Sequence, residues 1–303
     1  MIDIYVTHYV TAAVDGINDI LIDQLYEMTR HTTPMNQARI CVVVWTNDPI
    51  YLDDLRARLP GGVQLVVNDR PGRPDLQPSM RNKVLDLARE SGCEAFVLLH
   101  NDVRPAIGWF EHLVDDWREA EKHWGRDSAI VTPRYTPYHL IDPHPEAVTN
   151  AVFWNEMRTV RKQSVHTEAS MAAWCEQHGF KFRHGRVNCP KKSEVTDDGH
   201  QLMMFIAGPH FFDAVGDCDE GYRGFNFDDS DWGIRALQAG KKNLKSHGAL
   251  IGHVEGFTFF APKMVMTDPT DNAQVFIAKW GRDMFNEMQT GELWRRLHRA
   301  QKR

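Results

Sequence analysis

The chain has 303 residues, of which 42% are hydrophobic and 25% are charged, and its formal net charge is −6. This composition is typical of a globular protein with one large domain or two fused subdomains, and the negative charge argues against a general nucleic-acid coat. No apolar run approaches the ~20 residues that span a bilayer. The five cysteines form no Cys-x-x-Cys pair, and an odd count without a secretory leader favours the cytoplasm.

The first half of the chain alternates apolar runs with amphipathic stretches, which predicts an α/β sheet with helical crossovers. The expected strands are residues 2–6, 39–45, 63–67 and 96–99. The expected helices are residues 17–29, 50–59 and 79–91. Right-handed crossovers bring the carboxyl ends of such strands to one edge of the sheet, where ligands of open α/β sheets bind.

The second half of the chain is more polar and less regular. We expect strands at residues 130–135, 203–206 and 247–254, and helices at 167–177, 231–239, 276–288 and 293–302. Gly240 should close the helix 231–239, because glycine readily takes the left-handed conformation found just after helix ends. We interpret residues 1–135 as a nucleotide-binding half and residues 136–303 as an acceptor-binding and catalytic half of one continuous unit.

The apolar strand 96–99 delivers His100, Asn101 and Asp102 at its carboxyl end. A carboxylate there is too costly to bury unpaired, so it must face water, a partner or a cation. A divalent cation bound to a diphosphate needs oxygen ligands and few protein side chains. The simpler interpretation is a strand-ending turn, in which Asn-Asp is common. Upstream, Arg81 has the planar charge that suits a phosphate, although a solvent-exposed arginine at a helix start is the simpler reading.

A second cluster is acidic and lies between two expected strands. Its members are Asp217, Asp219, Glu220, Asp228, Asp229 and Asp231. The last three stand at an expected helix start, where free N–H groups stabilise carboxylates, and Asp231 is the expected cap. Three acidic groups exceed what a cap needs, and their repulsion could raise one pKa toward that of a working base. His253, at the end of a late strand, is by itself more often a structural histidine.

Taken in order, these motifs resemble the inverting glycosyltransferases of family 2, which have the GT-A fold. The matching segments are Arg81-Asn82, then FVLLHND, GPHFFDAVGDCDEGY, FNFDDSDWGIRALQAG and IGHVEG, and the ending VFIAKWG is similar to a closing Lys-Trp-Gly segment of some relatives. Four features depart from the family pattern, and the first is the loop THYVTAAVD, which is not the typical short apolar entry. The metal motif His-Asn-Asp keeps one carboxylate, Cys218 replaces a phenylalanine, and Asp228-Asp229 replaces Glu-Asp.

The resemblance implies a donor, a metal and roles for individual residues. Asp102 and His253 would hold Mn²⁺ or Mg²⁺ as a Lewis acid on the leaving diphosphate. Asp229 would be the general base, with Asp228 positioning the acceptor. The donor would be a nucleoside diphosphate sugar, and UDP is the family's commonest carrier. The residues expected to bind this donor are Thr7, Tyr9, Asp48, Asp69, Arg81, Asn82 and Asn101.

The acceptor and two other classes of protein stay open. Residues 141–200, with Trp154, Trp174, His166 and His184, are expected on the acceptor side. Saccharide, protein, lipid-linked sugar and modified nucleic acid base all remain candidate acceptors. A GT-A nucleotidyltransferase normally has a lysine near its amino terminus, and residues 1–30 contain none. A non-catalytic carbohydrate- or protein-binding relative fits the altered metal motif, but not the presence of Asp229 together with His253.

Overall fold

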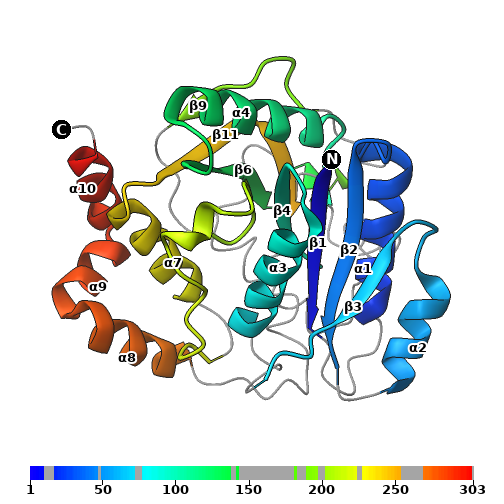
Figure 1. Cartoon of the computed structure of the whole chain (residues 1–303), viewed down its shortest axis with the longest axis horizontal. Helices are drawn as coiled ribbons and strands as arrows, with labels where there is room; N and C mark the ends of the chain where they lie inside the picture. Colours follow the sequence, from blue (N-terminus) through cyan, green and yellow to red (C-terminus); the bar gives the residue numbers. More distant parts are fainter. Residues whose placement is uncertain are drawn as a thin grey trace.

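The computed structural model is an α/β fold built on one nine-stranded sheet (Figure 1). The strand order is β3-β2-β1-β4-β10-β6-β11-β5, with β9 paired to β11 off this path. The structure describes residues 1–9, 17–46, 49–71, 77–137, 141–142, 181–182, 189–196, 202–223, 227–253 and 269–301. None of the described helices is long and apolar enough to cross a membrane.

Four parallel strands form one side of the sheet and confirm the expected strands of the first half. They are β1 (Ile2–Tyr9), β2 (Ala38–Trp45), β3 (Gln64–Val67) and β4 (Ala95–His100). In the register of these strands, Thr7 lies opposite Val43 on one neighbour and His100 on the other. The carboxyl ends of β1, β2 and β4 therefore meet at one edge, as predicted.

Helices cover both faces of this part of the sheet. They are α1 (Ile17–Glu27), which continues into a π-helical turn at Met28–Thr32, α2 (Pro49–Arg58) and α3 (Gln77–Ser91). Because side chains alternate along a strand, Ile4 and Val6 of β1 pack in the cluster that includes Leu21 of α1. Tyr5, between them, belongs to the opposite cluster with Val84 of α3.

The rest of the chain, after β4, completes the same sheet. The remaining strands of the sheet are β5 (Val103–Pro105), β6 (Ala129–Pro137), β9 (Val195–Thr196), β10 (Phe205–Ala207) and β11 (Lys242–His253). Strand β10 lies antiparallel between β4 and β6, so the sheet runs through both halves of the sequence. A separate two-stranded sheet pairs β7 (Ile141–Asp142) with β8 (Lys181–Phe182).

Helix α4 (Trp109–Trp124) is absent from the expected elements. Its apolar residues nevertheless recur at helical spacing, which is the signal that would have found it. They are all buried: Trp109, Phe110, Leu113, Val114, Trp117 and Ala120. The helix packs on β6 and β11, and so covers the half of the sheet that the other helices of that face leave open.

Three helices end the chain, and one prediction about them is wrong. The expected single helix 276–288 is two helices, α8 (Pro269–Trp280) and α9 (Arg282–Gln289). Gly281 separates them with a φ of 87°, a conformation that glycine adopts without a steric penalty. The last helix, α10 (Glu292–Ala300), follows as expected, whereas the expected helix 167–177 lies outside the described residues.

Helix α7 (Asp228–Gln238) connects the sheet to these last helices. It ends before Gly240, whose φ is 75° as expected for a residue that closes a helix. Trp232 of α7 stacks on Phe212 with a centroid distance of 4.2 Å, within the cluster that also packs against α3.

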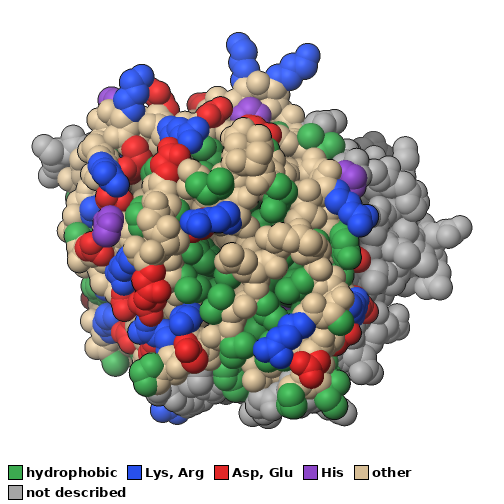
Figure 2. Space-filling view, turned by 45° about the vertical axis from the view of Figure 1, so that its right-hand side comes forward, with side chains coloured by type: hydrophobic (Ala, Val, Ile, Leu, Met, Phe, Trp, Pro, Cys, Tyr) green, Lys and Arg blue, Asp and Glu red, His purple; other side chains and the backbone are tan. Residues whose placement is uncertain are grey.

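On the face drawn in Figure 2, lysines and arginines lie next to acidic side chains. Ion pairs such as Arg58 with Asp54 follow the same pattern.

Candidate functional site

The turn after β4 lies at the edge where β1 and β4 end. Asn101 and Asp102 in this turn are buried, with 6% and 4% of their surface exposed. Gln24 of α1 holds the backbone on both sides of them. Its Nε2 donates to the carbonyl oxygen of His100 at 3.0 Å, and its Oε1 accepts from the N–H of Val103 at 3.4 Å. The backbone of this turn is therefore held by the side chain of Gln24, which the sequence analysis did not single out.

The two residues expected to bind a metal are Asp102, in the turn before β5, and His253, at the end of β11. Strand β5 begins directly after Asp102 and pairs antiparallel with the end of β11, so that Val103 lies opposite His253. The side chain of His253 lies outside the described part of the chain. A buried carboxylate next to a strand position that carries an imidazole fits a divalent cation whose other ligands are diphosphate oxygens. Among the described side chains, no group of three or more His, Cys, Asp or Glu could hold a metal ion.

Arg81 lies buried between the end of β4 and the start of α7, with 2% of its surface exposed. Its Nη2 is 3.5 Å from Nε2 of His100, and its Nη1 is 2.8 Å from Oδ2 of Asp228. The second contact is an ion pair by distance but lacks hydrogen-bond angles. Burial works against the charge of Arg81, but attraction from Asp228 and Asp229 outweighs it and raises its pKa. The alternative of a solvent-exposed arginine is therefore wrong.

Asp229 stands in the first turn of α7 beside Asp228 and has 7% of its surface exposed. Burial raises its pKa to about 6, and repulsion from Asp228 adds to that effect against the lowering influence of Arg81. The N–H of Ser230 donates to Oδ1 of Asp229 at 2.8 Å. A carboxylate with this pKa is ionised at neutral pH and can still accept a proton, as a general base requires.

The residue before this pair has an unusual backbone conformation. Phe227 is the N-cap residue of α7, with a φ of 70° and no side-chain hydrogen bond to the helix. A bulky residue in this left-handed region is strained. Its ring packs against Phe276 of α8 and Phe285 of α9, with centroid distances of 5.6 and 5.7 Å. The C-terminal helices therefore hold the strained entry into the Asp228-Asp229 turn.

The prediction that Asp231 caps α7 is wrong. Asp231 is fully buried within the helix, where two cations neutralise it. Nε of Arg235 and Nζ of Lys279 each lie 2.9 Å from its carboxylate, and Nε1 of Trp280 donates to it at 2.8 Å. Lys279 also contacts Asp219 at 2.6 Å. The Lys-Trp of the closing segment therefore attaches α8 to α7, and Asp231 has a structural role.

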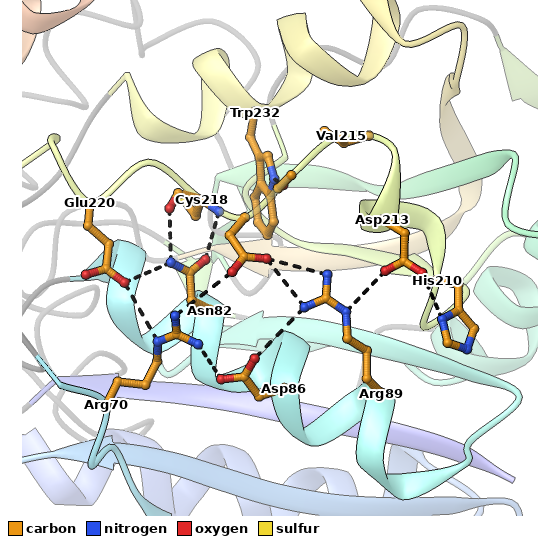
Figure 3. Close-up of polar contacts among 12 residues, drawn as sticks. Arg70, Asn82, Asp86, Arg89, His210, Asp213, Val215, Cys218, Glu220 and Trp232 are labelled. Atoms are coloured by element: carbon orange, nitrogen blue, oxygen red, sulfur yellow. Dashed lines mark hydrogen bonds and ion pairs between the residues drawn. The ribbon is translucent and has the colours of Figure 1, made fainter.

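The other acidic residues help to dock residues 210–222 on α3 (Figure 3). Asn82 binds Cys218 with both ends of its amide, because its Nδ2 donates to the carbonyl oxygen at 3.0 Å and its Oδ1 accepts from the N–H at 2.7 Å. Arg89 pairs with Asp213 at 3.3 Å and with Asp217 at 3.4 Å. The amide of Asn82, which we expected to bind the nucleotide, is thus engaged in this docking.

The remaining donor-binding candidates are spread along the strand ends. The hydroxyl of Thr7 is buried and donates to the carbonyl oxygen of Leu99 at 3.3 Å. Asp69 follows β3 with 76% of its side chain exposed and binds Lys83 at 2.7 Å, which lowers its pKa. Several predicted residues lie outside the described part of the chain: the side chain of Tyr9, and Asp48, Trp154, His166, Trp174 and His184.

His8, next to Thr7, is a second residue that sequence reasoning missed. It is fully buried, and its two ring nitrogens contact Asn18 at 3.0 Å and Asn101 at 2.8 Å. Burial lowers its pKa to about 4, so the ring is neutral at pH 7. The available signal was its position, because residues 2, 4, 6 and 8 share one face of the strand. A polar residue on an otherwise apolar face indicates a buried hydrogen-bond network.

Comparison with known proteins supports the fold. No family model and no curated protein matches the chain. The solved structure of GalNAc-T7 with UDP, GalNAc and Mn²⁺ aligns with a TM-score of 0.56 and 14% identity over 98% of this chain and 55% of that one. S. aureus TarS residues 1–349 align with a TM-score of 0.40 and 10% identity over 93% and 73% of the two chains. This chain thus spans about half the length of GalNAc-T7, and the predicted GT-A glycosyltransferase fold is confirmed.

Proposed function

We propose that this chain is an inverting, family-2-like glycosyltransferase. It moves a sugar from a nucleoside diphosphate sugar, in the first place a UDP-sugar, to an acceptor hydroxyl with the help of Mn²⁺ or Mg²⁺. One observation carries the proposal: a line of side chains from the partly buried His100 at the end of β4 to the buried start of α7. In this line Arg81 lies between His100 and Asp228, and Asp229, with its raised pKa, stands at the end.

The donor would lie across the carboxyl ends of β3, β2, β1 and β4. Neighbouring strands are about 4.8 Å apart, so the three steps from β3 to β4 cover about 14 Å. A nucleoside diphosphate in extended form is of similar length. The base and ribose would lie near Thr7, Tyr9, Asp48 and Asp69, and the diphosphate would lie near Asp102. This arrangement makes residues 1–135 the donor half and leaves residues 136–303 to the acceptor.

Departure of the diphosphate requires positive charge at the turn after β4. Asp102 and His253 would hold the divalent cation, which supplies Lewis-acid stabilisation of the leaving group when bound. Arg81 adds a fixed charge nearby, because Asp228 holds its guanidinium in place. Nε of Arg81 is buried without a hydrogen-bond partner among the described residues, so it is available to a phosphate oxygen.

Asp229 would take the proton of the acceptor. As the hydroxyl oxygen attacks the anomeric carbon, the bond from that carbon to the diphosphate breaks, and the hydroxyl proton moves to a carboxylate oxygen of Asp229. Repulsion from Asp228 helps to keep the pKa of Asp229 near 6, which makes it a stronger base than an ordinary aspartate. Asp228 therefore serves the reaction twice, by orienting Arg81 and by raising the basicity of its neighbour.

Thermal unfolding with a panel of sugar nucleotides and Mn²⁺ tests the donor site. A nucleotide that binds the folded protein raises the midpoint of unfolding. We expect a UDP-sugar to do so only with the metal, and Asp102→Ala to abolish this rise. Asp53→Ala, at an exposed ion pair of α2, is the control and should behave as wild type. Equal stabilisation of Asp102→Ala, or stabilisation that persists in EDTA, would contradict the metal role.

Hydrolysis of the sugar nucleotide without acceptor separates an enzyme from a binding relative. A glycosyltransferase is expected to release sugar slowly to water in the presence of Mn²⁺. A protein that has kept only the binding function would show the thermal shift without release. That result would favour a non-catalytic binding relative, the alternative suggested by the single carboxylate of His100-Asn101-Asp102.

A further inference from the structure

A chain of hydrogen bonds runs from the surface of α2 to the turn that carries Asn101. Nδ2 of Asn18 donates to Oδ2 of Asp54 at 2.8 Å. Oδ1 of Asn18 lies 3.0 Å from Nε2 of His8, and Nδ1 of His8 lies 2.8 Å from Nδ2 of Asn101. His8, Asn18 and Asn101 are all buried. We call these four side chains the His8 relay.

The outer end of the His8 relay fixes the direction of every bond in it. The carboxylate of Asp54, ion-paired with Arg58 at 3.1 Å, accepts from Asn18. The carbonyl oxygen of Tyr51, 3.4 Å from the same amide nitrogen, can only accept as well. Asn18 must therefore present its NH₂ group outward and its oxygen to His8. Because an amide oxygen only accepts, Nε2 of His8 must carry the proton.

The same logic passes through the imidazole ring to Asn101. A neutral ring with its proton on Nε2 has a lone pair on Nδ1, which requires a donor. Asn101 satisfies it with its NH₂ group. The amide oxygen of Asn101 is therefore directed away from His8. Gln24 fixes the backbone of this turn, and the His8 relay fixes which end of the Asn101 side chain is presented.

We propose that His8 is a positioning residue of the donor site. As the Nε2–H tautomer, it holds Asn101 so that the amide oxygen accepts a hydrogen bond from a hydroxyl of the bound nucleoside diphosphate. The proposal rests on the proposed function, and it adds a residue and a defined polarity to it. Burial keeps His8 neutral, so this polarity does not reverse near pH 7.

The tautomer of His8 can be measured without any ligand. Long-range ¹H–¹⁵N NMR spectra of the full chain at pH 7 distinguish a protonated ring nitrogen from one with a lone pair. We expect a single neutral form with the proton on Nε2. A proton on Nδ1, or a doubly protonated ring, would overturn the relay whatever the protein catalyses.

A double-mutant cycle tests whether His8 acts through Asn101. Calorimetric titration with UDP and Mn²⁺ should show that His8→Phe and Asn101→Ala each weaken binding roughly 3- to 10-fold, the loss expected for one hydrogen bond. The double variant should bind no more weakly than Asn101→Ala alone, because the two residues form one unit. A merely structural histidine would instead give losses that multiply, and that result would overturn the positioning role alone.

Two further outcomes keep the cycle decisive. If the wild-type protein does not bind UDP with Mn²⁺, both the proposed function and the role of Asn101 are overturned. If His8→Phe does not fold, Asn18→Leu replaces it in the cycle, because it breaks the relay one bond further out. Asn18→Leu alone should weaken binding, and the double variant Asn18→Leu with Asn101→Ala should bind no more weakly than Asn101→Ala alone. Retention of full affinity in a folded Asn18→Leu variant would count against the relay.

Discussion

At the end of β1, neutral hydrogen bonds from His8 and Asn18 hold Asn101. At the start of α7, by contrast, burial raises the pKa of Asp229, and two charges then act on it in opposite directions, since Asp228 raises it further and Arg81 lowers it. Neutral groups with defined donors and acceptors fix orientation, and they do so unchanged over the pH range in which no member titrates. Opposed charges control the strength of a base. We therefore expect the pH dependence of this protein to arise at α7 and the presentation of the donor to be set at β1.

The largest expected effect tests the charged side of this comparison. Asp229→Asn keeps the size of the side chain but removes the base, so transfer should fall by about 10² to 10⁴-fold, the usual contribution of a positioned base. Initial rates with saturating donor and acceptor measure the loss. Asp213→Asn, at an exposed carboxylate on the docked segment, is the matched control and should transfer as wild type does. Turnover of Asp229→Asn near the wild-type rate would remove Asp229 from the role of base.

The next effect concerns stability rather than turnover. Asp231→Ala should lower the free energy of unfolding by about 2 to 4 kcal/mol, because it leaves Trp280 without its acceptor and separates Arg235 and Lys279 from a buried carboxylate. Urea unfolding followed by circular dichroism measures this change. Asp53→Ala, which breaks an exposed pair with Arg56, should cost less than about 1 kcal/mol. Equal costs for the two variants would mean that Asp231 does not attach α8 to α7.

The smallest expected effect, a shift in the pH profile, distinguishes the charged start of α7 from the neutral end of β1. Transfer by the wild-type protein should rise as pH passes about 6, because Asp229 must be ionised to accept a proton. Asp228→Asn removes the repulsion and frees Arg81, and both changes lower the pKa of Asp229. The acid limb of kcat/KM should then move down by about one pH unit. His8→Phe should leave this limb in place, and a shift in that variant would contradict the division between the two sides.

The raised pKa of Asp229 affects stability and transfer in opposite directions as pH rises. An unfolded Asp229 ionises near 3.8, whereas the folded protein holds its proton up to about 6. Between these values the folded state binds more protons than the unfolded state does. The contribution of Asp229 to the free energy of unfolding therefore falls as pH rises through this window.

Periodic patterns made much of the first half predictable. The strands ending at Trp45 and His100 followed from apolar runs, and their neighbourhood followed from the handedness of crossovers. Helix α4 had an equally clear pattern that the predictions overlooked. The break at Gly281 was harder to predict, because an isolated glycine within a helical pattern is often tolerated.

In the candidate site, too, some features could be predicted from the sequence and others could not. Asp102 and Asp229 could be proposed from residue type, position and the order of motifs, since each of these is local in the sequence. Their environments could not be proposed in this way. The cap of α7 is Phe227 and not Asp231, because Asp231 is neutralised by Lys279 from a helix that arrives much later in the chain. Such partners depend on packing between distant segments.

By itself, the sequence determined the types of side chain at the strand ends and the acidic start of α7, because short-range periodicity and turn chemistry are encoded in neighbouring residues. Only the tertiary structure decided the environment and the partners of each group. Burial raises the pKa of Asp229 and lowers that of His8. Contacts across the fold pair Arg81 with Asp228 and His8 with Asn101. Desolvation and hydrogen-bond direction arise only when distant segments pack together.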